Sequence, residues 1–413
     1  MRSRLPLLAL FPATVLAVVI GTPFVLGDHP VRWTSGSAVP RIVQGDAPEQ
    51  SGHEADRNTP ATAPTHAAGT AAPAADPTKV AEPWKEGMPQ WGVQFYWEEE
   101  PKQRSDAFIE AQAHKQATYL IGLGANSASL SFPFSTAGPA SNTLRAGAKT
   151  PSAERVGIVL RVFKEAGLRT TLRPTMDEAT LNPPTGWRGN IEPASRSAWF
   201  ASYQKFLTPY LKTAHETKTD TFVVGTELNS LEGDPGWKPL VSFAEKATSS
   251  EVAYDANWDN YVGGHIDMPV SHLGVDSYFP VEVPDTAPVS ALVDGWNTWL
   301  DKKAKGPLPN ITLAEAGIGA MDGAYKAPGD FYTKRAVNPK VQANWYTAVC
   351  QVVRQRRMQG VYWWSIWFDD DPNTPPDDKH ASRLDFAGRP QTEKAVKSCF
   401  TSDYAGPGAD STS

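Results

Sequence analysis

The sequence predicts an α/β fold, a (β/α)8 TIM barrel over residues 86–400, preceded by an export segment and a disordered linker. Strand-like and helix-like segments alternate through this range, which is the pattern of a parallel sheet with helices outside it. Eight such units in about 315 residues fit a closed barrel. No glycine-rich turn opens a helix after a strand, which argues against the alternative, a doubly wound open sheet with a dinucleotide site.

The eight expected strands are short apolar runs that end at polar residues, glycine or proline. The run Phe-Val-Val-Gly between residues 221 and 226 is typical, because a strand inside a parallel sheet is buried on both faces. In chain order, strands are expected at residues 91–96, 127–134, 169–173, 221–226, 252–258, 272–278, 311–315 and 361–367.

The expected helices are identified by apolar spacing and by the residues at their ends. Between residues 151 and 167, Val156, Val159, Leu160 and Phe163 lie at positions i, i+3, i+4 and i+7 of one helical face. A proline begins this segment and a glycine ends it, as is common for helices. The helices are expected at residues 106–123, 151–167, 194–217, 237–248, 289–305, 340–359 and 392–399.

The N-terminus has the pattern of an export signal. Arg2 and Arg4 precede an uncharged apolar run over residues 5–26. The run approaches the roughly 20 residues that cross a bilayer, and no A-x-A cleavage site follows it. Residues 1–27 are therefore expected to be either a cleaved signal peptide or a membrane anchor. In both cases the protein is expected to be extracellular, secreted or tethered to the outer face of the membrane.

The segments that flank the barrel have no apolar periodicity. Residues 28–85 are rich in Ala, Pro and Thr and are expected to form a disordered linker, and residues 401–413 a flexible tail. The two cysteines, Cys350 and Cys399, can form one disulfide that closes a loop of about 48 residues. Two buried free thiols are the alternative.

Charge and motifs exclude several classes of function. The chain carries 39 Lys plus Arg against 45 Asp plus Glu and has no long basic block, which argues against nucleic acid as a partner. HExxH, GxSxG and Cys/His metal-binding spacings are absent from the sequence. The acidic run 369–371 lacks the glycine and the terminal Glu of a calcium loop, so it is interpreted as a solvated loop. No metal and no cofactor is expected.

Two glutamates stand where a barrel of this kind carries its chemistry, at the C-terminal ends of strands. Glu227 follows Phe-Val-Val-Gly-Thr, and Glu315 follows Ile-Thr-Leu-Ala. A buried glutamate is costly, and either one alone could cap a helix or pair with an arginine such as Arg173. Two of them on strands that face each other across the barrel mouth favour a catalytic pair.

Paired carboxylates and aromatic rings are the groups that cleave a glycosidic bond. One acid protonates the leaving oxygen, and one carboxylate attacks the anomeric carbon. Tyr278 could donate a hydrogen bond to the attacking carboxylate, and Trp364 could stack on a sugar face, with core packing as its alternative. Some of the 14 tryptophans lie in expected helices and are expected to pack in the core; these are Trp199, Trp296, Trp299 and Trp345.

The chain resembles the retaining glycoside hydrolases of the large (β/α)8 clan, and most closely family 113, which is known for β-mannanase activity. The resemblance covers about residues 90–399 and consists of seven pieces in the order of the family. The pieces are residues 124–134, 172–174, 187–191 with 199–203, 224–228, 254–258, 273–280 and 314–317.

This resemblance implies roles for the two glutamates. Glu227 is implied as the acid/base and Glu315 as the nucleophile of a double displacement that keeps the anomeric configuration. In such an enzyme the two carboxyl groups are expected to lie about 5 to 5.5 Å apart. The residues expected to bind the sugar are Tyr278, Asn257, Trp258, Arg173, Trp187, Trp364 and Trp367.

The expected activity is therefore that of an endo-β-1,4-mannanase, acting as a monomer on a polysaccharide or oligosaccharide. Two alternatives remain open from the sequence. The same type of enzyme could act on another β-glycan, such as a β-glucan or an amino-sugar chain. A catalytically silent glycan-binding barrel on the cell surface is the other, although a binding module has no need of the paired glutamates.

Overall fold

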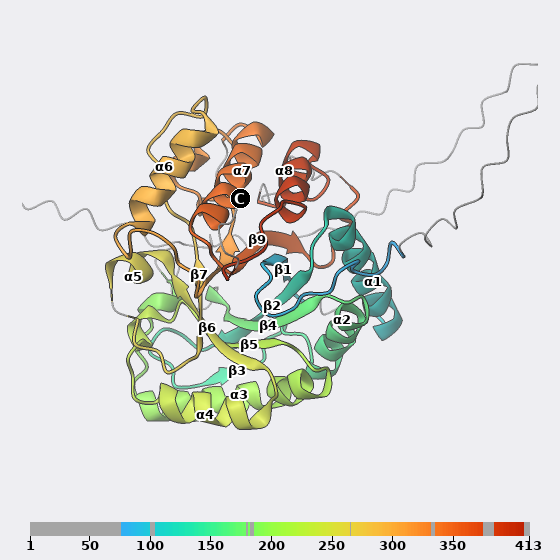
Figure 1. The fold of residues 1–413 in the computed structure, drawn as a ribbon. Helices are drawn as coiled ribbons and strands as arrows, with labels where there is room; N and C mark the ends of the chain where they lie inside the picture. Colours follow the sequence, from blue (N-terminus) through green and yellow to red (C-terminus); the bar gives the residue numbers. More distant parts are fainter. Residues whose placement is uncertain are drawn as a thin grey trace, which may run out of the picture.

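The structure, a computed structural model, describes residues 76–99, 104–178, 181, 186–264, 266–331, 335–374 and 384–408. In this part of the chain, parallel strands form a closed barrel with helices around it (Figure 1). The strand order is β1-β9-β8-β7-β6-β5-β4-β2, and β1 also pairs with β2, which closes the sheet. The predicted (β/α)8 barrel is confirmed.

The barrel strands lie where the apolar runs predicted them. The largest difference is in the third strand, which continues past Pro174 to Met176. Its pairing with the next strand includes only Thr171 and Leu172, so Pro174 removes no hydrogen bond from that ladder. The strands are β1 (Gln90–Tyr96), β2 (Ser127–Thr136), β4 (Arg169–Met176), β5 (Thr221–Thr226), β6 (Glu251–Asn257), β7 (His272–Asp276), β8 (Ile311–Ala316) and β9 (Gly360–Trp367).

Short elements decorate the C-terminal side of the barrel. β3 (Leu144–Arg145) pairs antiparallel with the end of β2. The strand β6 ends one residue earlier than expected, because the Asn257 side chain accepts a hydrogen bond from Asp259 N and so begins the short helix α5 (Trp258–Gly263). The 3-10 helices are η2 (Arg188–Asn190), η3 (Asn229–Leu231) and η4 (Ala324–Lys326).

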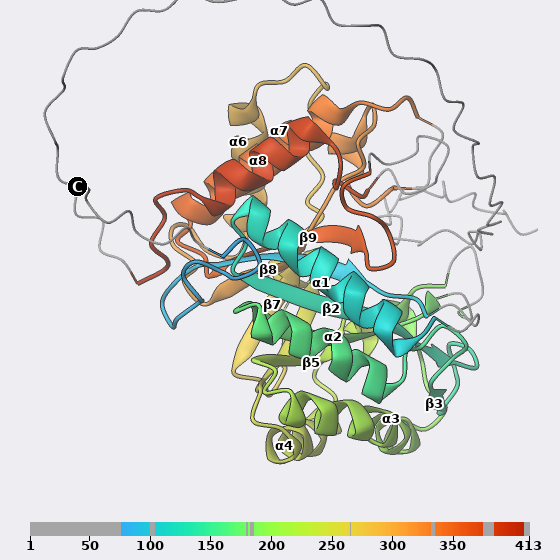
Figure 2. The same ribbon diagram turned by 90° about the vertical axis from the view of Figure 1, so that its right-hand side faces the viewer.

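The longer helices form the outer layer. Figure 2 shows α1, α2 and α3 lying side by side along the barrel wall. Serine side chains cap these three helices at their first turns, which satisfies one of the free backbone N–H groups of each. The helices are α1 (Asp106–Leu123), α2 (Ala153–Glu165), α3 (Arg196–Glu216), α4 (Trp237–Ala247), α6 (Val289–Leu300), α7 (Pro339–Gln355) and α8 (Pro390–Phe400).

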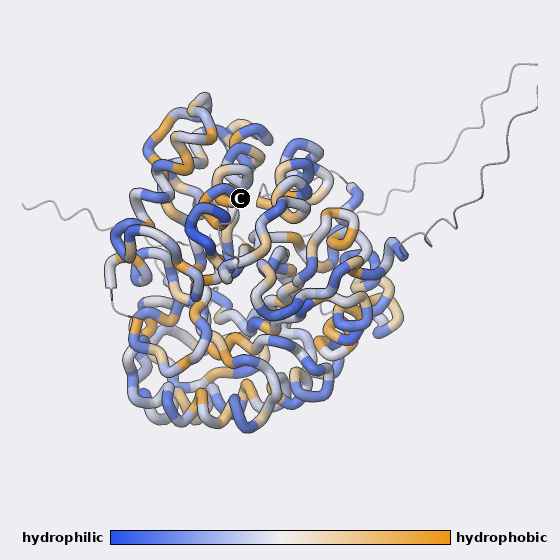
Figure 3. The backbone as a smooth tube through the Cα atoms, in the orientation of Figure 1, coloured by the Kyte–Doolittle hydropathy of each residue, from blue (hydrophilic) through white to orange (hydrophobic). Residues whose placement is uncertain are grey.

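The main core lies between the helices and the strands, where apolar segments of both meet (Figure 3). The predicted apolar face of α2 is buried there, and Phe163 packs on Phe95 of β1 with ring centroids 5.4 Å apart. The helical tryptophans Trp199, Trp296 and Trp345 are fully buried in this layer. The helices are therefore held mainly by burial of apolar surface.

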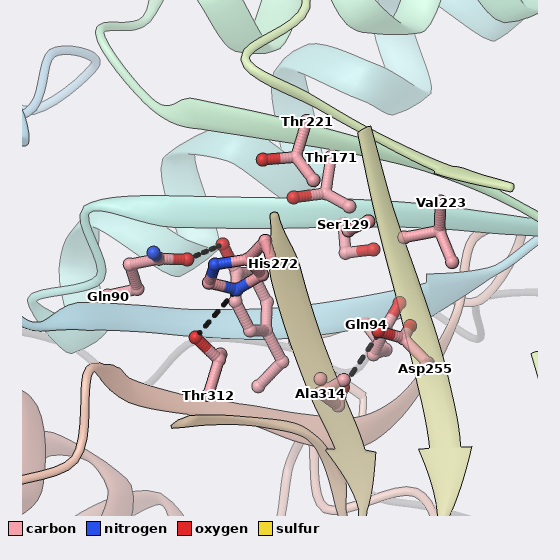
Figure 4. Close-up of a pocket in the computed structure, with 13 residues that line it drawn as sticks. Gln90, Gln94, Ser129, Thr171, Thr221, Val223, Asp255, His272, Thr312 and Ala314 are labelled. Carbon is pink, nitrogen blue, oxygen red and sulfur yellow. Dashed lines mark hydrogen bonds between the residues drawn. The ribbon is translucent and has the colours of Figure 1, made fainter. Parts of the chain in front are cut away.

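The inside of the barrel is polar. A cavity of about 20 Å³, enough for about one water molecule, lies among strand side chains (Figure 4). His272 Nε2 and Thr312 Oγ1 lie 3.1 Å apart, and Gln94 Nε2 donates to the carbonyl of Ala314 at 2.8 Å. Asp255 also lines this cavity. The polar interior thus extends as far as the candidate active site.

Two boundaries differ from those expected. Residues 76–85 were predicted as linker, yet Val80 N donates to the carbonyl of Ala166 at 2.9 Å and the ring of Trp84 lies 4.7 Å from the Arg169 guanidinium. The tail predicted from residue 401 contains Tyr404, which packs on the barrel. These segments have the composition of a linker and a tail, but contacts of Val80, Trp84 and Tyr404 hold the parts nearest the barrel against it.

The expected export segment and residues 28–75 of the expected linker lie outside the described residues. Within the part of the chain that the structure describes, no helix combines the length and the apolar character needed to cross a membrane.

A disulfide joins α7 to α8. Cys350 and Cys399 are bonded, with Cα atoms 5.7 Å apart. Since the bond closes a long loop, replacing both cysteines by alanine is expected to lower the free energy of unfolding by about 2–4 kcal/mol. Urea unfolding of the two proteins measures the difference. Equal midpoints and slopes would contradict a stabilising role.

Candidate active site

The two predicted glutamates lie at the C-terminal ends of their strands and are almost fully buried. Glu227 follows β5 and is 7% exposed, and Glu315 is the fifth residue of β8 and is 6% exposed. Glu227 has a φ of 51°, a left-handed conformation that is uncommon for a residue with a side chain. Its backbone N–H donates to the carbonyl of Asp255 at 2.8 Å, and Leu228 N donates to Tyr254 Oη at 2.9 Å. The backbone around Glu227 is therefore held in place by neighbouring strand β6.

Glu315 is surrounded by donors. Tyr278 Oη donates to Glu315 Oε2 at 2.6 Å, and Arg173 Nη1 lies 2.6 Å from Glu315 Oε1. Each of the two carboxyl oxygens therefore has its own partner. The arrangement orients the Glu315 side chain.

Arg173 lies beneath Glu315 with no solvent-exposed surface. Its Nε donates to Asp255 Oδ2 at 2.6 Å and its Nη2 to Asp276 Oδ2 at 2.7 Å. Burial lowers the pKa of this guanidinium, but the charges of Asp276, Glu315 and Asp255 raise it well above its ordinary value. The fully buried side chain of Arg173 thus contacts three carboxylates, and its expected role in binding sugar stays a prediction.

Glu227 is held differently from Glu315. Asn257 Nδ2 donates to Glu227 Oε1 at 2.7 Å, and Arg188 Nη1 donates to Oε2 at 3.3 Å. Burial raises the pKa of Glu227 to about 7, although Arg188 lowers it, and the charge of Glu315 raises it further. The two glutamates are thus close enough to interact. A carboxyl with a pKa near neutral can both give and take a proton.

An aromatic group flanks Glu315. Trp364 and Tyr278 belong to one cluster with Phe331 and Leu384, and Tyr96 and Trp258 pack against it. Such rings offer flat apolar faces of the kind that stack on a sugar.

The model of glycoside hydrolase family 113 matches residues 94–383, a range that contains Glu227 and Glu315. The chain belongs to glycoside hydrolase family 113. As a member of this family it is a glycosidase, and a polysaccharide or oligosaccharide is its class of substrate. No curated protein matches the chain.

Solved structures of family 113 share the fold of this glycosidase. One β-1,4-mannanase of the family is 19% identical, with a TM-score of 0.62, and the match covers 77% of this chain and 100% of that one. The β-mannanase AaManA from Alicyclobacillus acidocaldarius, solved in complex with ManMIm, is 20% identical with a TM-score of 0.60, and the match covers 76% of this chain and 97% of that one. Because these identities are low, the similarity supports the barrel fold alone.

The remaining expected sugar-binding residues of this family 113 enzyme lie on two other elements. Trp367 ends β9 and meets Tyr96 edge-on, with ring centroids 5.0 Å apart. Trp187 immediately precedes η2, and its ring lies against Gly189, where an added Cβ would come within 2.4 Å of it. Their roles in sugar binding stay predictions, as does the separation of the Glu227 and Glu315 carboxyl groups.

Three acidic residues of the site were missed at the sequence level. Glu178 was missed because the third strand was expected to end at Arg173, three residues before Met176, where β4 ends. Asp255 and Asp276 lay within expected strands and were given no role. Their signal was available, because a charged residue inside an otherwise apolar barrel strand needs a buried partner. In the described residues no cluster of three or more His, Cys, Asp and Glu could hold a metal ion.

Proposed function

We propose that the protein is a retaining endo-β-1,4-mannanase in which Glu315 is the nucleophile and Glu227 the acid/base. One observation carries this proposal: the two buried glutamates have opposite environments. Tyr278 donates a hydrogen bond to Glu315 and Arg173 forms an ion pair with it, whereas burial raises the pKa of Glu227 to about 7. A carboxyl group held by a cation and a hydroxyl, beside one with a pKa near neutral, is the arrangement that a nucleophile and a general acid require.

In the first step, a carboxylate oxygen of Glu315 attacks the anomeric carbon while Glu227 gives its proton to the leaving glycosidic oxygen. The bond between that carbon and the leaving oxygen breaks, and a covalent glycosyl-enzyme forms. In the second step, Glu227 takes a proton from a water molecule, and the water oxygen attacks the same carbon and releases Glu315. Two inversions at one carbon restore the β configuration.

Membership of family 113 and the solved β-1,4-mannanases of that family support mannan as the polymer. The experiment is hydrolysis of a panel that contains β-1,4-mannan, glucomannan, β-1,4-glucan and an amino-sugar polymer. We expect the highest kcat/KM on β-1,4-mannan. We also expect oligosaccharides of several lengths among the earliest products, because an endo enzyme cleaves internal bonds. Preference for β-glucan or an amino-sugar chain would keep the mechanism and replace the substrate.

The pH dependence of the enzyme follows from Glu227. The first step needs this residue protonated, and its pKa is raised to about 7. The protonated fraction falls above that pH, so kcat/KM is expected to fall about tenfold per pH unit on the alkaline side. Initial rates on manno-oligosaccharides between pH 4 and 10 measure this limb. A limb that begins above about pH 9 would exclude Glu227 as the group that titrates.

Export is also proposed, because a disulfide joins Cys350 to Cys399 and such bonds persist in oxidising compartments. Fractionation of producing cells, with mass spectrometry of the N-terminus, tests it. We expect the enzyme in the medium or on the outer face of the cell membrane. Enzyme in the cytoplasm with both thiols free would refute export.

A further inference from the structure

We propose that Arg188, anchored by Glu178, is a positioning residue that acts on the reaction through Glu227. It holds the acid/base carboxyl in place, and its positive charge stabilises the negative charge that forms there when the proton leaves. This inference rests on the proposed function, since it assigns Glu227 the acid/base role. The family match covers residues 94–383 and assigns no role to Arg188 or Glu178.

The contacts form a chain of three buried side chains. Arg188 Nε lies 3.1 Å from Glu178 Oε1, and the backbone N–H of Arg188 donates to the same oxygen at 3.1 Å. At the other end of the guanidinium, Nη1 donates to Glu227 Oε2 at 3.3 Å. Glu178 thus fixes both the backbone and the side chain of Arg188, and Arg188 reaches the acid/base oxygen that Asn257 does not contact.

The position argues against a simple role in binding sugar. Arg188 is 6% exposed, and two carboxylates already contact its guanidinium. Burial lowers the pKa of Arg188, but Glu178, Glu227 and Glu315 together raise it above its ordinary value. The guanidinium therefore stays charged through the reaction, and its nearest reacting group is Glu227.

The charge of Glu227 changes twice in each turnover, and this gives the pair its use. When Glu227 is protonated, Glu178 balances the charge of Arg188. When Glu227 has given its proton to the leaving oxygen, its carboxylate forms beside a cation that is already in place. If the interaction with Arg188 were too strong, Glu227 would stay ionised and could not donate a proton. If it were too weak, the buried carboxylate would be left unpaired. Because Arg188 is shared with Glu178, its interaction with Glu227 lies between these extremes.

Other charged and titratable groups act on Glu227 from the surrounding strands. They remain unchanged in the variants proposed below, so they cannot produce a shift that differs in sign between them. These groups are Arg173 of β4, Tyr254 of β6, Asp276 of β7, Tyr278 of the loop after β7 and Glu315 of β8.

Two substitutions test the pair with opposite expected signs. Arg188→Met removes the cation, so Glu227 holds its proton more tightly, and the alkaline limb of kcat/KM is expected to move up by about one pH unit or more. Glu178→Gln keeps the shape and frees the arginine for Glu227, so the limb is expected to move down by about half a unit or more. Arg188→Lys keeps a cation and is expected to restore most of the wild-type limb.

A double-mutant cycle shows whether Arg188 acts through Glu227. In a Glu227→Ala background, Arg188→Met is expected to cause no more than about a twofold further change in kcat/KM. The control is Arg196→Met, which removes an exposed arginine that pairs with Asp234 on the same side of the barrel. It is expected to leave the pH profile unchanged. Thermal unfolding of every variant identifies those that fail to fold.

Limbs that stay within about 0.2 pH unit of wild type, or that move in the same direction in both variants, would overturn the inference. So would a full further loss from Arg188→Met in the Glu227→Ala background. If Arg188→Met does not fold, the isosteric Glu178→Gln alone decides by the sign of its shift. Failure of the proposed function is distinct, because Glu227→Ala would then keep wild-type activity.

Discussion

Replacing Glu315 by alanine is expected to lower kcat on β-1,4-mannan by at least about 10⁴-fold. The substitution removes the oxygen that forms the covalent intermediate, so the remaining site can only bind the substrate. KM is expected to change much less than kcat. The measurement is release of reducing ends by equal amounts of wild type and Glu315→Ala, both shown to be folded by circular dichroism.

Azide provides the decisive check on this variant. A small anion that fills the space left by Glu315 attacks from the same face, so an activated β-mannoside should yield the α-mannosyl azide. Glu216→Ala serves as the control, because Glu216 is exposed and pairs with Lys212 one helical turn away. Retention of more than about a tenth of wild-type kcat by Glu315→Ala would exclude Glu315 as nucleophile.

The Glu227→Ala variant is expected to separate substrates by their leaving groups. On mannan, whose leaving oxygen needs a proton, the rate should fall by about 10²- to 10⁴-fold. On 2,4-dinitrophenyl β-mannoside, the formation of the glycosyl-enzyme should be nearly unchanged, because dinitrophenolate leaves without protonation. Stopped-flow measurement of the dinitrophenolate burst separates this first step from the slow hydrolysis that follows.

Azide should accelerate turnover of the Glu227→Ala variant as well, and here the product should be the β-mannosyl azide, since the azide replaces the water of the second step. Asn257→Asp is a comparison that keeps Glu227 but replaces the amide donor to its Oε1 by a carboxyl group. Equal losses of Glu227→Ala on mannan and on the dinitrophenyl substrate would contradict the acid/base assignment.

The fold could be predicted because local patterns decide it. The apolar face of Val156, Val159 and Phe163 packs on the barrel as its spacing implied. Eight apolar runs separated by helices have few other ways to bury both faces of every strand. The ends of the domain were predicted less well, since Val80 and Tyr404 are held by contacts with distant segments that composition does not reveal.

The candidate site was predicted in part. Glu227 and Glu315 lie at strand ends, and strand ends can be predicted from the sequence. The support beneath them is non-local: Arg173 and Asp276 are 103 positions apart in the sequence, yet Arg173 Nη2 donates to Asp276 Oδ2 at 2.7 Å. Glu178 lies beyond the residue at which the third strand was expected to end. A charged residue inside a strand indicates that a partner exists, but only the closed barrel determines which residue it is.

The anomeric configuration of the first product tests the central claim most directly. Proton NMR during hydrolysis of β-1,4-mannopentaose by the full-length protein detects the new reducing end before it mutarotates. The double displacement by Glu315 and Glu227 predicts that the β-anomer appears first and that the α-anomer grows in later. Initial formation of the α-anomer would show a single displacement and would contradict the assignment of Glu315 as nucleophile.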